Sequence, residues 1–292
     1  MQFPDYPFES HYLSVNGHRM HYLDEGDNNA PPVVMVHGNP TWSFFYRKPV
    51  MALHDGCRCI VPDHIGMGLS EKPPESDYGY QLNNRIDDLE VLLDQLEIRE
   101  RITLLLHDWG GMIGMGYACR HPGRIARLII LNTAAFHLPP NTRLPWQLRL
   151  VRGPFGPFLI KGLNSFSRAA LRLCTANTLT AQVKQAYLAP YDSWSNRHAV
   201  LRFVQDIPLK PGDPSYDLVS RVDRDIINFK NTPMLICWGM KDFVFTGAFL
   251  EQWRARFSGA EIHAFTDAGH YLLEDAADGV IPIMRQFLKQ HS

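Results

Sequence analysis

Short, uninterrupted apolar runs that alternate with helical patterns limit what this chain of 292 residues can fold into. Such runs are typical of strands buried on both faces of a sheet. Between them, apolar residues recur at helical spacing, and this β-α alternation favours a mostly parallel sheet with flanking helices. Strands are predicted at residues 19–24, 32–37, 59–62, 102–106, 125–131, 233–238 and 261–265. Helices are predicted at residues 82–96, 112–119, 249–257 and 280–288.

The alternation stops after residue 136 and resumes near residue 226. The intervening stretch contains many prolines and aromatic residues but no β-α pattern. We therefore expect an α/β core domain formed by residues 1–136 and 226–292, interrupted by a helical cap domain at residues 137–225. In open α/β sheets the active site lies beyond the carboxyl ends of the strands, so an insertion there would cover it.

The segment Asp108-Trp109-Gly110-Gly111 follows a predicted buried strand and opens a helix of small residues. This order matches a nucleophile elbow, a tight turn that lifts one side chain into the active-site cleft. Asp108 stands where many such sites have serine, and Leu106 replaces the usual first glycine. The pattern therefore predicts a carboxylate nucleophile.

Two further polar residues follow later strands. Asp242 comes after the predicted strand at residues 233–238, and His270 follows the strand at residues 261–265. The chain order nucleophile, acid, histidine matches that of α/β-hydrolases. In this arrangement His270 would activate water, and Asp242 would hold its tautomer and stabilise the imidazolium.

A carboxylate nucleophile favours attack on sp³ carbon, which gives an alkyl-enzyme ester that water can cleave. Suitable substrates carry a good leaving group or ring strain, as halides, epoxides and small lactones do. Asn39 lies in the loop that supplies oxyanion donors in this fold, and Trp109 adds an indole N–H. Both are predicted to bind the departing anion.

Each of these residues also has a simpler explanation. Asp108 could occupy an ordinary turn, His270 could lie on the surface, and Asp242 could cap a helix. Asn39 beside a proline is usually a turn residue. Their joint occurrence, in order and each after a strand, favours the catalytic interpretation.

Composition excludes several partner classes. Lys and Arg total 29 against 30 Asp and Glu, so the net charge of −1 argues against nucleic acid or an anionic membrane as the main partner. No apolar run approaches the length of a membrane span. The histidines have no metal-ligand spacing, and no metal or cofactor is expected. Five scattered cysteines and an N-terminus without a signal-peptide pattern predict a cytoplasmic protein.

The motifs His37-Gly38-Asn39-Pro40 and His107-Asp108-Trp109-Gly110-Gly111, with the late Asp and His, resemble haloalkane dehalogenases of the α/β-hydrolase superfamily. The resemblance implies Asp108 as nucleophile, His270 as base and Asp242 as acid, with Asn39 and Trp109 binding the leaving group. One branch of that family places its acid where Asn132 stands here. Epoxide hydrolases share the second motif and use cap tyrosines, for which this chain offers Tyr187, Tyr191 and Tyr216.

A closer resemblance extends over nearly the whole chain, to the β-lactone decarboxylases of bacterial long-chain olefin biosynthesis. It rests on the stretches at residues 62–70, 132–136, 189–192 and 205–209, of which the cap stretches are the most telling. The resemblance implies conversion of cis-3,4-dialkyl β-lactones to cis-alkenes and CO₂, and a possible complex with other olefin-pathway enzymes.

An uncharged, apolar small molecule is therefore the expected substrate, with Phe136, Trp146 and Phe166 as candidate substrate-binding residues. Haloalkane dehalogenase, epoxide hydrolase and a non-catalytic binding protein on the same fold remain as alternatives.

Overall fold

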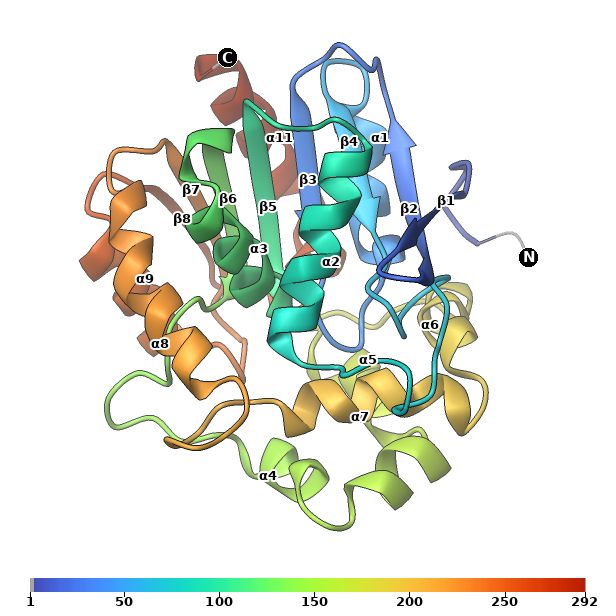
Figure 1. The fold of residues 1–292 in the computed structure, drawn as a ribbon. Helices are drawn as coiled ribbons and strands as arrows, with labels where there is room; N and C mark the ends of the chain where they lie inside the picture. Colours follow the sequence, from blue (N-terminus) through green and yellow to red (C-terminus); the bar gives the residue numbers. More distant parts are fainter. Residues whose placement is uncertain (1–2, 292) are drawn as a thin grey trace.

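The computed structural model describes residues 3–291 and is built on one eight-stranded sheet (Figure 1). The strands lie in the order β1-β2-β4-β3-β5-β6-β7-β8. β1 and β2 run antiparallel to their neighbours, and the strands from β4 to β8 pair in parallel. Their bounds are β1 His11–Val15, β2 His18–Glu25, β3 Pro32–Val36, β4 Arg58–Pro62, β5 Ile102–Asp108, β6 Ile125–Thr133, β7 Met234–Gly239 and β8 Glu261–Phe265.

Helices cover both faces of the sheet and one of its ends. In Figure 1, α2 and α3 lie in front of the sheet, whereas α1 and α11 lie behind it. The bounds are α1 Arg47–Leu53, α2 Leu82–Gln95, α3 Trp109–Arg120, α4 Trp146–Arg152, α5 Ser165–Leu173, α6 Ala181–Leu188, α7 His198–Gln205, α8 Tyr216–Asp225, α9 Gly247–Arg256, α10 Leu272–Asp275 and α11 Ala277–Gln290.

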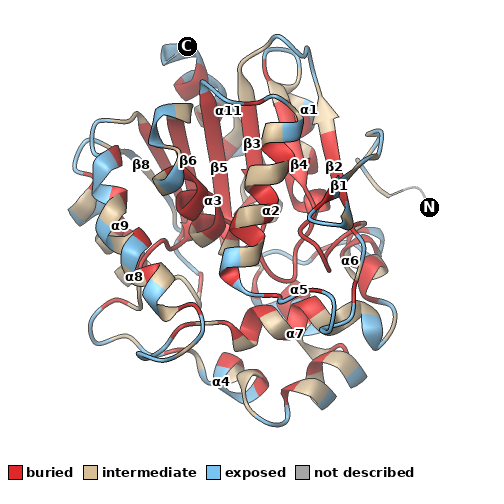
Figure 2. Ribbon diagram, viewed as in Figure 1, coloured by how far each residue is buried: buried red, intermediate tan, exposed pale blue. Residues whose placement is uncertain are grey.

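The core lies along the central strands. Every residue of β5 and of β7 is buried, and burial decreases toward the edge strand β8 (Figure 2). Continuous burial explains why these strands consist mainly of apolar residues, since side chains on both faces meet a helix layer. The α/β-hydrolase fold with a mostly parallel sheet is thus confirmed.

The observed elements differ from the predicted ones mainly at the carboxyl ends of strands. β5 continues through His107 and Asp108, and α3 begins at Trp109 rather than at residue 112. The early start is possible because Gly110 packs directly against the Val36 carbonyl oxygen, where a Cβ would collide. The antiparallel edge strand β1 was not predicted.

The insertion between β6 and β7 is helical, as expected. α4, α5, α6 and α7 lie together beyond one end of the sheet (Figure 1). α8 falls within the predicted cap range but packs against α3 beside the sheet. The division into core and cap domains therefore stays a prediction, because α8 lies in the predicted cap range but packs beside the sheet.

Among residues 3–291, no helix is long and apolar enough to cross a membrane. In the same part of the chain, no three or more His, Cys, Asp and Glu side chains are grouped so that they could hold a metal ion.

Candidate active site

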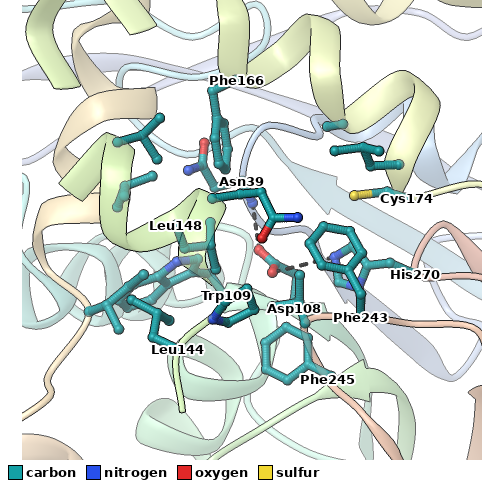
Figure 3. Close-up of a pocket in the computed structure, with 18 of the residues that line it drawn as sticks. Asn39, Asp108, Trp109, Leu144, Leu148, Phe166, Cys174, Phe243, Phe245 and His270 are labelled. Carbon is teal, nitrogen blue, oxygen red and sulfur yellow. Dashed lines mark hydrogen bonds and ion pairs between the residues drawn. The ribbon is translucent and has the colours of Figure 1, made fainter. Parts of the chain in front are cut away.

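Four loops bring the predicted polar residues to one edge of the sheet. Asn39 follows β3, Asp108 ends β5, Asp242 follows β7 and His270 follows β8. These strands are parallel, so their carboxyl ends share the same edge. Figure 3 shows Asn39, Asp108 and His270 close together among the residues that line one pocket.

The predicted nucleophile, histidine and acid form a continuous chain of contacts. His270 Nε2 lies 3.5 Å from Asp108 Oδ2. On the other side of the ring, Nδ1 lies 2.7 Å from Asp242 Oδ2. All three residues are buried. This geometry lets Asp242 orient the imidazole while the opposite nitrogen faces the proposed nucleophile.

The backbone at Asp108 has the strained conformation expected of a nucleophile elbow. Its φ of 52° and ψ of −127° lie outside the regions that non-glycine residues favour. The neighbouring strand helps to hold the turn, because the Thr133 hydroxyl donates to the Asp108 carbonyl. α3 begins at the next residue, and its N-terminus favours negative charge at this position.

Burial and the carboxylates of Asp108 and Asp242 shift the pKa of His270 in opposite directions. Burial lowers the pKa of its imidazole, but the charge of Asp242 and the hydrogen bonds with Asp108 and Asp242 outweigh that effect and raise the pKa to about 10. Burial also raises the pKa of Asp108, yet the hydrogen bond and charge of His270 bring it below its usual value. At neutral pH the free site therefore holds a His270 imidazolium beside the Asp108 carboxylate.

This pairing predicts a pH-dependent stability. Because the folded-state pKa of His270 exceeds its ordinary value, the stability that its protonation contributes is complete below pH 6.5 and is lost as pH rises through about 10. Denaturant unfolding across this window should show a decline that is flattened in His270→Gln. Parallel profiles for the two proteins would contradict the prediction.

The predicted acid, Asp242, is held by a residue whose role the sequence did not reveal. Asn132 Nδ2 donates to Asp242 Oδ2 at 3.0 Å, and its Oδ1 accepts from the Gly239 N–H at 2.7 Å. The other oxygen of Asp242 accepts the backbone N–H groups of Val244 and Phe245. The sequence marked Asn132 only as the place where related enzymes carry their acid. Here its amide positions Asp242 instead.

Replacing Asn132 with alanine should destabilise the protein and slow turnover. The change leaves the buried Gly239 N–H without its partner and removes a donor to Asp242, which should lower the free energy of unfolding by about 1–3 kcal/mol. Urea denaturation would measure the loss, with Asn29→Ala in an exposed turn as control. Equal stability of Asn132→Ala and the parent would refute the positioning role.

The two predicted leaving-group ligands lie beside Asp108. The backbone N–H of Asn39 donates to Asp108 Oδ1 at 2.7 Å, while its side-chain amide donates to the Val200 carbonyl of α7 at 3.1 Å. A primary amide has a second N–H. Trp109 packs edge-on against Phe203, and its indole N–H has no hydrogen-bond partner among the described residues.

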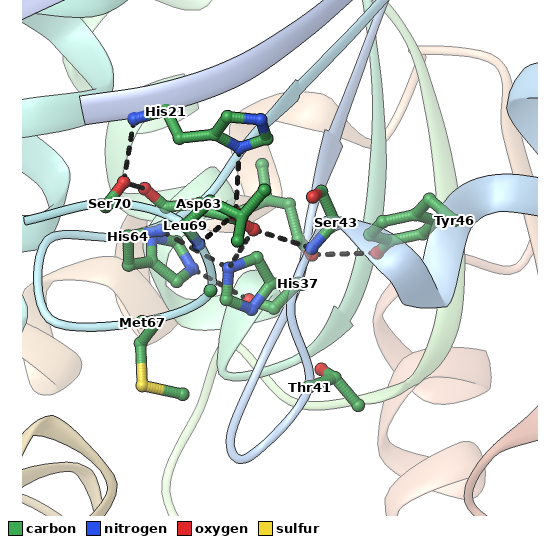
Figure 4. Close-up of polar contacts among 12 residues, drawn as sticks. His21, His37, Thr41, Ser43, Tyr46, Asp63, His64, Met67, Leu69 and Ser70 are labelled. Atoms are coloured by element: carbon green, nitrogen blue, oxygen red, sulfur yellow. Dashed lines mark hydrogen bonds and ion pairs between the residues drawn. The ribbon is translucent and has the colours of Figure 1, made fainter. Parts of the chain in front are cut away.

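A buried polar cluster fixes the loop that carries Asn39 (Figure 4). The Asp63 carboxylate accepts the backbone N–H of Ser43 at 2.6 Å and pairs with His21 at 2.8 Å. His64 contacts the His37 carbonyl at 2.9 Å. Burial raises the pKa of Asp63, but His21 overcomes this and lowers it to about 2. A charged Asp63 thus holds the Ser43 end of the turn around Asn39, while His64 contacts the His37 end.

A cavity of about 520 Å³ extends from the polar residues into the cap. Its lining includes all three predicted substrate-binding residues. Phe136 is buried at its side, Phe166 faces it from α5, and Trp146 on α4 is 68% exposed. The sequence did not single out Leu144, Leu148, Phe243 and Phe245, which also line it (Figure 3).

The three tyrosines that would favour an epoxide substrate do not line this cavity, within the part of the chain described. The Tyr187 hydroxyl donates to Glu274, and Tyr191 is buried near Thr41. Tyr216 stacks on His137. Within residues 3–291, the cavity lining therefore offers the epoxide alternative no activating phenol.

Comparison with known proteins agrees with this architecture. The family described as alpha/beta hydrolase fold matches residues 31–277. The chain belongs to the α/β-hydrolase family. Among α/β-hydrolases of solved structure, haloalkane dehalogenase DatA from Agrobacterium tumefaciens superposes with a TM-score of 0.86 at 25% identity, covering 97% of each chain.

Within the α/β-hydrolase family, two relatives share one name. A cis-3-alkyl-4-alkyloxetan-2-one decarboxylase from Shewanella oneidensis is 54% identical over 97% of this chain and 89% of its own. One from Xanthomonas campestris is 45% identical over 100% and 99%. Haloalkane dehalogenase 2 from Mycobacterium tuberculosis is 33% identical over 94% and 93%. The chain is thus more similar to these decarboxylases than to that dehalogenase.

Proposed function

We propose that the protein is a β-lactone decarboxylase that converts cis-3,4-dialkyl oxetan-2-ones to cis-alkenes and CO₂. The observation that carries the proposal is 54% identity, over 97% of the chain, to a cis-3-alkyl-4-alkyloxetan-2-one decarboxylase. The site supports it, because a carboxylate lies at the end of a cavity lined largely by apolar side chains. An uncharged dialkyl lactone fits both features.

In the first step, Asp108 attacks the ring carbon C4. An Asp108 Oδ lone pair forms the new C–O bond, and the C4–O1 bond of the strained ring breaks. The electron pair goes to O1, which becomes part of a free carboxylate on C3. The Trp109 indole N–H and the second amide N–H of Asn39 stabilise this charge as it develops.

In the second step, the bond between C3 and the new carboxylate breaks and releases CO₂. Its electron pair becomes the C3=C4 double bond, while the C4–O pair returns to Asp108. Inversion at C4 places the Asp108 oxygen opposite the carboxylate. Fragmentation from that arrangement retains the cis relation of the two alkyl groups. The nucleophile is regenerated, and no water is consumed.

His270 has a different role in this route from the one it has in hydrolysis. An imidazolium beside Asp108 keeps the carboxylate ionised between turnovers. In a hydrolytic route, alkylation would neutralise Asp108 and remove one of the influences that raise the pKa of His270. The ring would then be a better base toward water, which is what a haloalkane dehalogenase requires.

Haloalkane dehalogenase activity is the second candidate. It is favoured by the donor pair Asn39 and Trp109 beside the nucleophile, which suits a halide as well as a carboxylate.

The test is to incubate the purified protein in ¹⁸O-water with a long-chain cis-β-lactone or with a bromoalkane. We expect cis-alkene and CO₂ from the lactone, negligible bromide, and no ¹⁸O in the peptide that contains Asp108. Bromide release without alkene would establish the dehalogenase instead. Label in Asp108 during lactone turnover would refute the water-free route. Binding of the lactone without any turnover would favour a non-catalytic binding protein.

We further propose a cytoplasmic location, which the five free cysteines support. A complex with enzymes that make the lactone would shorten the path of this apolar substrate through water.

A further inference from the structure

The cap carries six exposed apolar side chains, here together called the cap face: Trp146, Leu150, Phe155, Phe158, Leu163 and Trp194. Phe155 is 66% exposed and Phe158 61%. Most of the exposed large apolar side chains of the described residues lie between Trp146 and Trp194. Patches of this kind mark interaction sites more often than neutral surface.

The residues of the cap face lie on neighbouring elements. Trp146 and Leu150 are four residues apart on α4, so they share one side of that helix. Phe158 and Trp194 both lie against Gly162. Their nearest ring atoms are 3.5 and 3.6 Å from the position that a Cβ atom on Gly162 would occupy. Figure 1 shows α4 at the outer edge of the cap, on the far side of α7 from the sheet.

The same region is strongly cationic. From residue 137 to residue 191 the sequence contains seven Lys and Arg but no Asp or Glu. Arg149, Arg168 and Arg172 are exposed and form no ion pair with a carboxylate among the described residues. The net charge of −1 conceals this, because the compensating acidic residues lie elsewhere in the chain.

We propose that the cap face binds the surface of a lipid bilayer that contains anionic lipids. Aromatic and leucine side chains beside arginines are the combination that such an interface favours, with the rings among the acyl chains and the cations at the headgroups. The net charge of the whole chain argues against an anionic membrane as the main partner, and the proposal departs from that expectation for this face only.

The cavity opens toward this face. Trp146 and Leu150 belong both to the cap face and to the cavity lining. Leu173 on α5, which is outside the cap face as defined, is also exposed and lines the cavity. If the substrate is the apolar lactone of the proposed function, it would pass from the bilayer into the cavity without crossing water. Membrane binding itself does not depend on that activity.

Flotation with phosphatidylcholine vesicles, with and without phosphatidylglycerol, tests the proposal on the full chain. We expect binding that requires phosphatidylglycerol and weakens with salt. The double variant Phe155→Ser/Phe158→Ser should bind about tenfold more weakly, and Arg149→Gln/Arg168→Gln/Arg172→Gln should lose the dependence on anionic lipid. Ile227→Ser, at an exposed site away from the cap, is the matched control and should bind as the parent does.

Absence of binding to either vesicle, or equal binding by the parent and both cap-face variants, would overturn the proposal. Sedimentation tests the other explanation, in which the cap face is a contact with another protein. Self-association that disappears in Phe155→Ser/Phe158→Ser, without vesicle binding by the parent, would assign the face to a protein contact. Lactone turnover in detergent reports on the proposed function separately, since vesicle binding by a protein that makes no alkene would refute only that function.

Discussion

Replacing Asp108 with alanine is expected to reduce alkene formation by at least about 10³-fold. In the proposed route, the Asp108 carboxylate is the only group of the protein that forms and breaks a covalent bond with the substrate. No neighbouring side chain can therefore substitute for it. Asp108→Asn should be equally impaired, although its oxygen can still accept the Asn39 N–H that Asp108 Oδ1 now accepts at 2.7 Å. Gas chromatography of the alkene measures both variants.

The chain provides a matched control three residues from the proposed catalytic histidine, His270. Asp267 is a surface carboxylate, 92% exposed, that pairs with Lys241 at 3.1 Å. Asp267→Asn removes the same charge close to His270 in sequence and should leave turnover unchanged. Turnover that survives in Asp108→Ala would remove the nucleophile assignment and, with it, the proposed chemistry.

Trp109→Phe is expected to lower kcat about 10²-fold and to change KM little. The indole N–H has no partner in the free protein among the described residues, so it is available to the carboxylate that develops as the ring opens. Phenylalanine keeps an aromatic ring against Phe203, 5.4 Å away between centroids, and removes only the donor. Because the charge appears in the transition state, the loss should fall on kcat.

Trp194→Phe removes an indole N–H from an exposed position outside the cavity lining and is the control for this change. We expect it to retain full turnover. A rise in KM alone for Trp109→Phe would show that this residue binds the ground state of the substrate and does not stabilise the developing anion.

The sequence predicted the architecture well because its main signals are local. Continuous apolar runs identified the buried strands, and helical spacing identified α2, α9 and α11 within a few residues of their bounds. The strand ends were less well predicted. His107 and Asp108 are polar residues that continue β5, and only their burial in the sheet shows that the strand reaches them. The edge strand β1 shows partial exposure and no continuous apolar run, so periodicity did not reveal it.

The order of Asp108, Asp242 and His270, each after a buried strand, was sufficient to predict that these side chains meet. Parallel strands bring their carboxyl ends to one edge, so a local pattern determines a long-range contact. The tertiary structure decided what the local pattern does not encode. It pairs Asn132 with Asp242 and, among the described residues, leaves the Trp109 indole N–H without a hydrogen-bond partner. It also leaves Phe155 and Phe158 of the cap exposed. These features depend on distances between residues far apart in the chain, and net charge and spacing along the sequence carry no information about them.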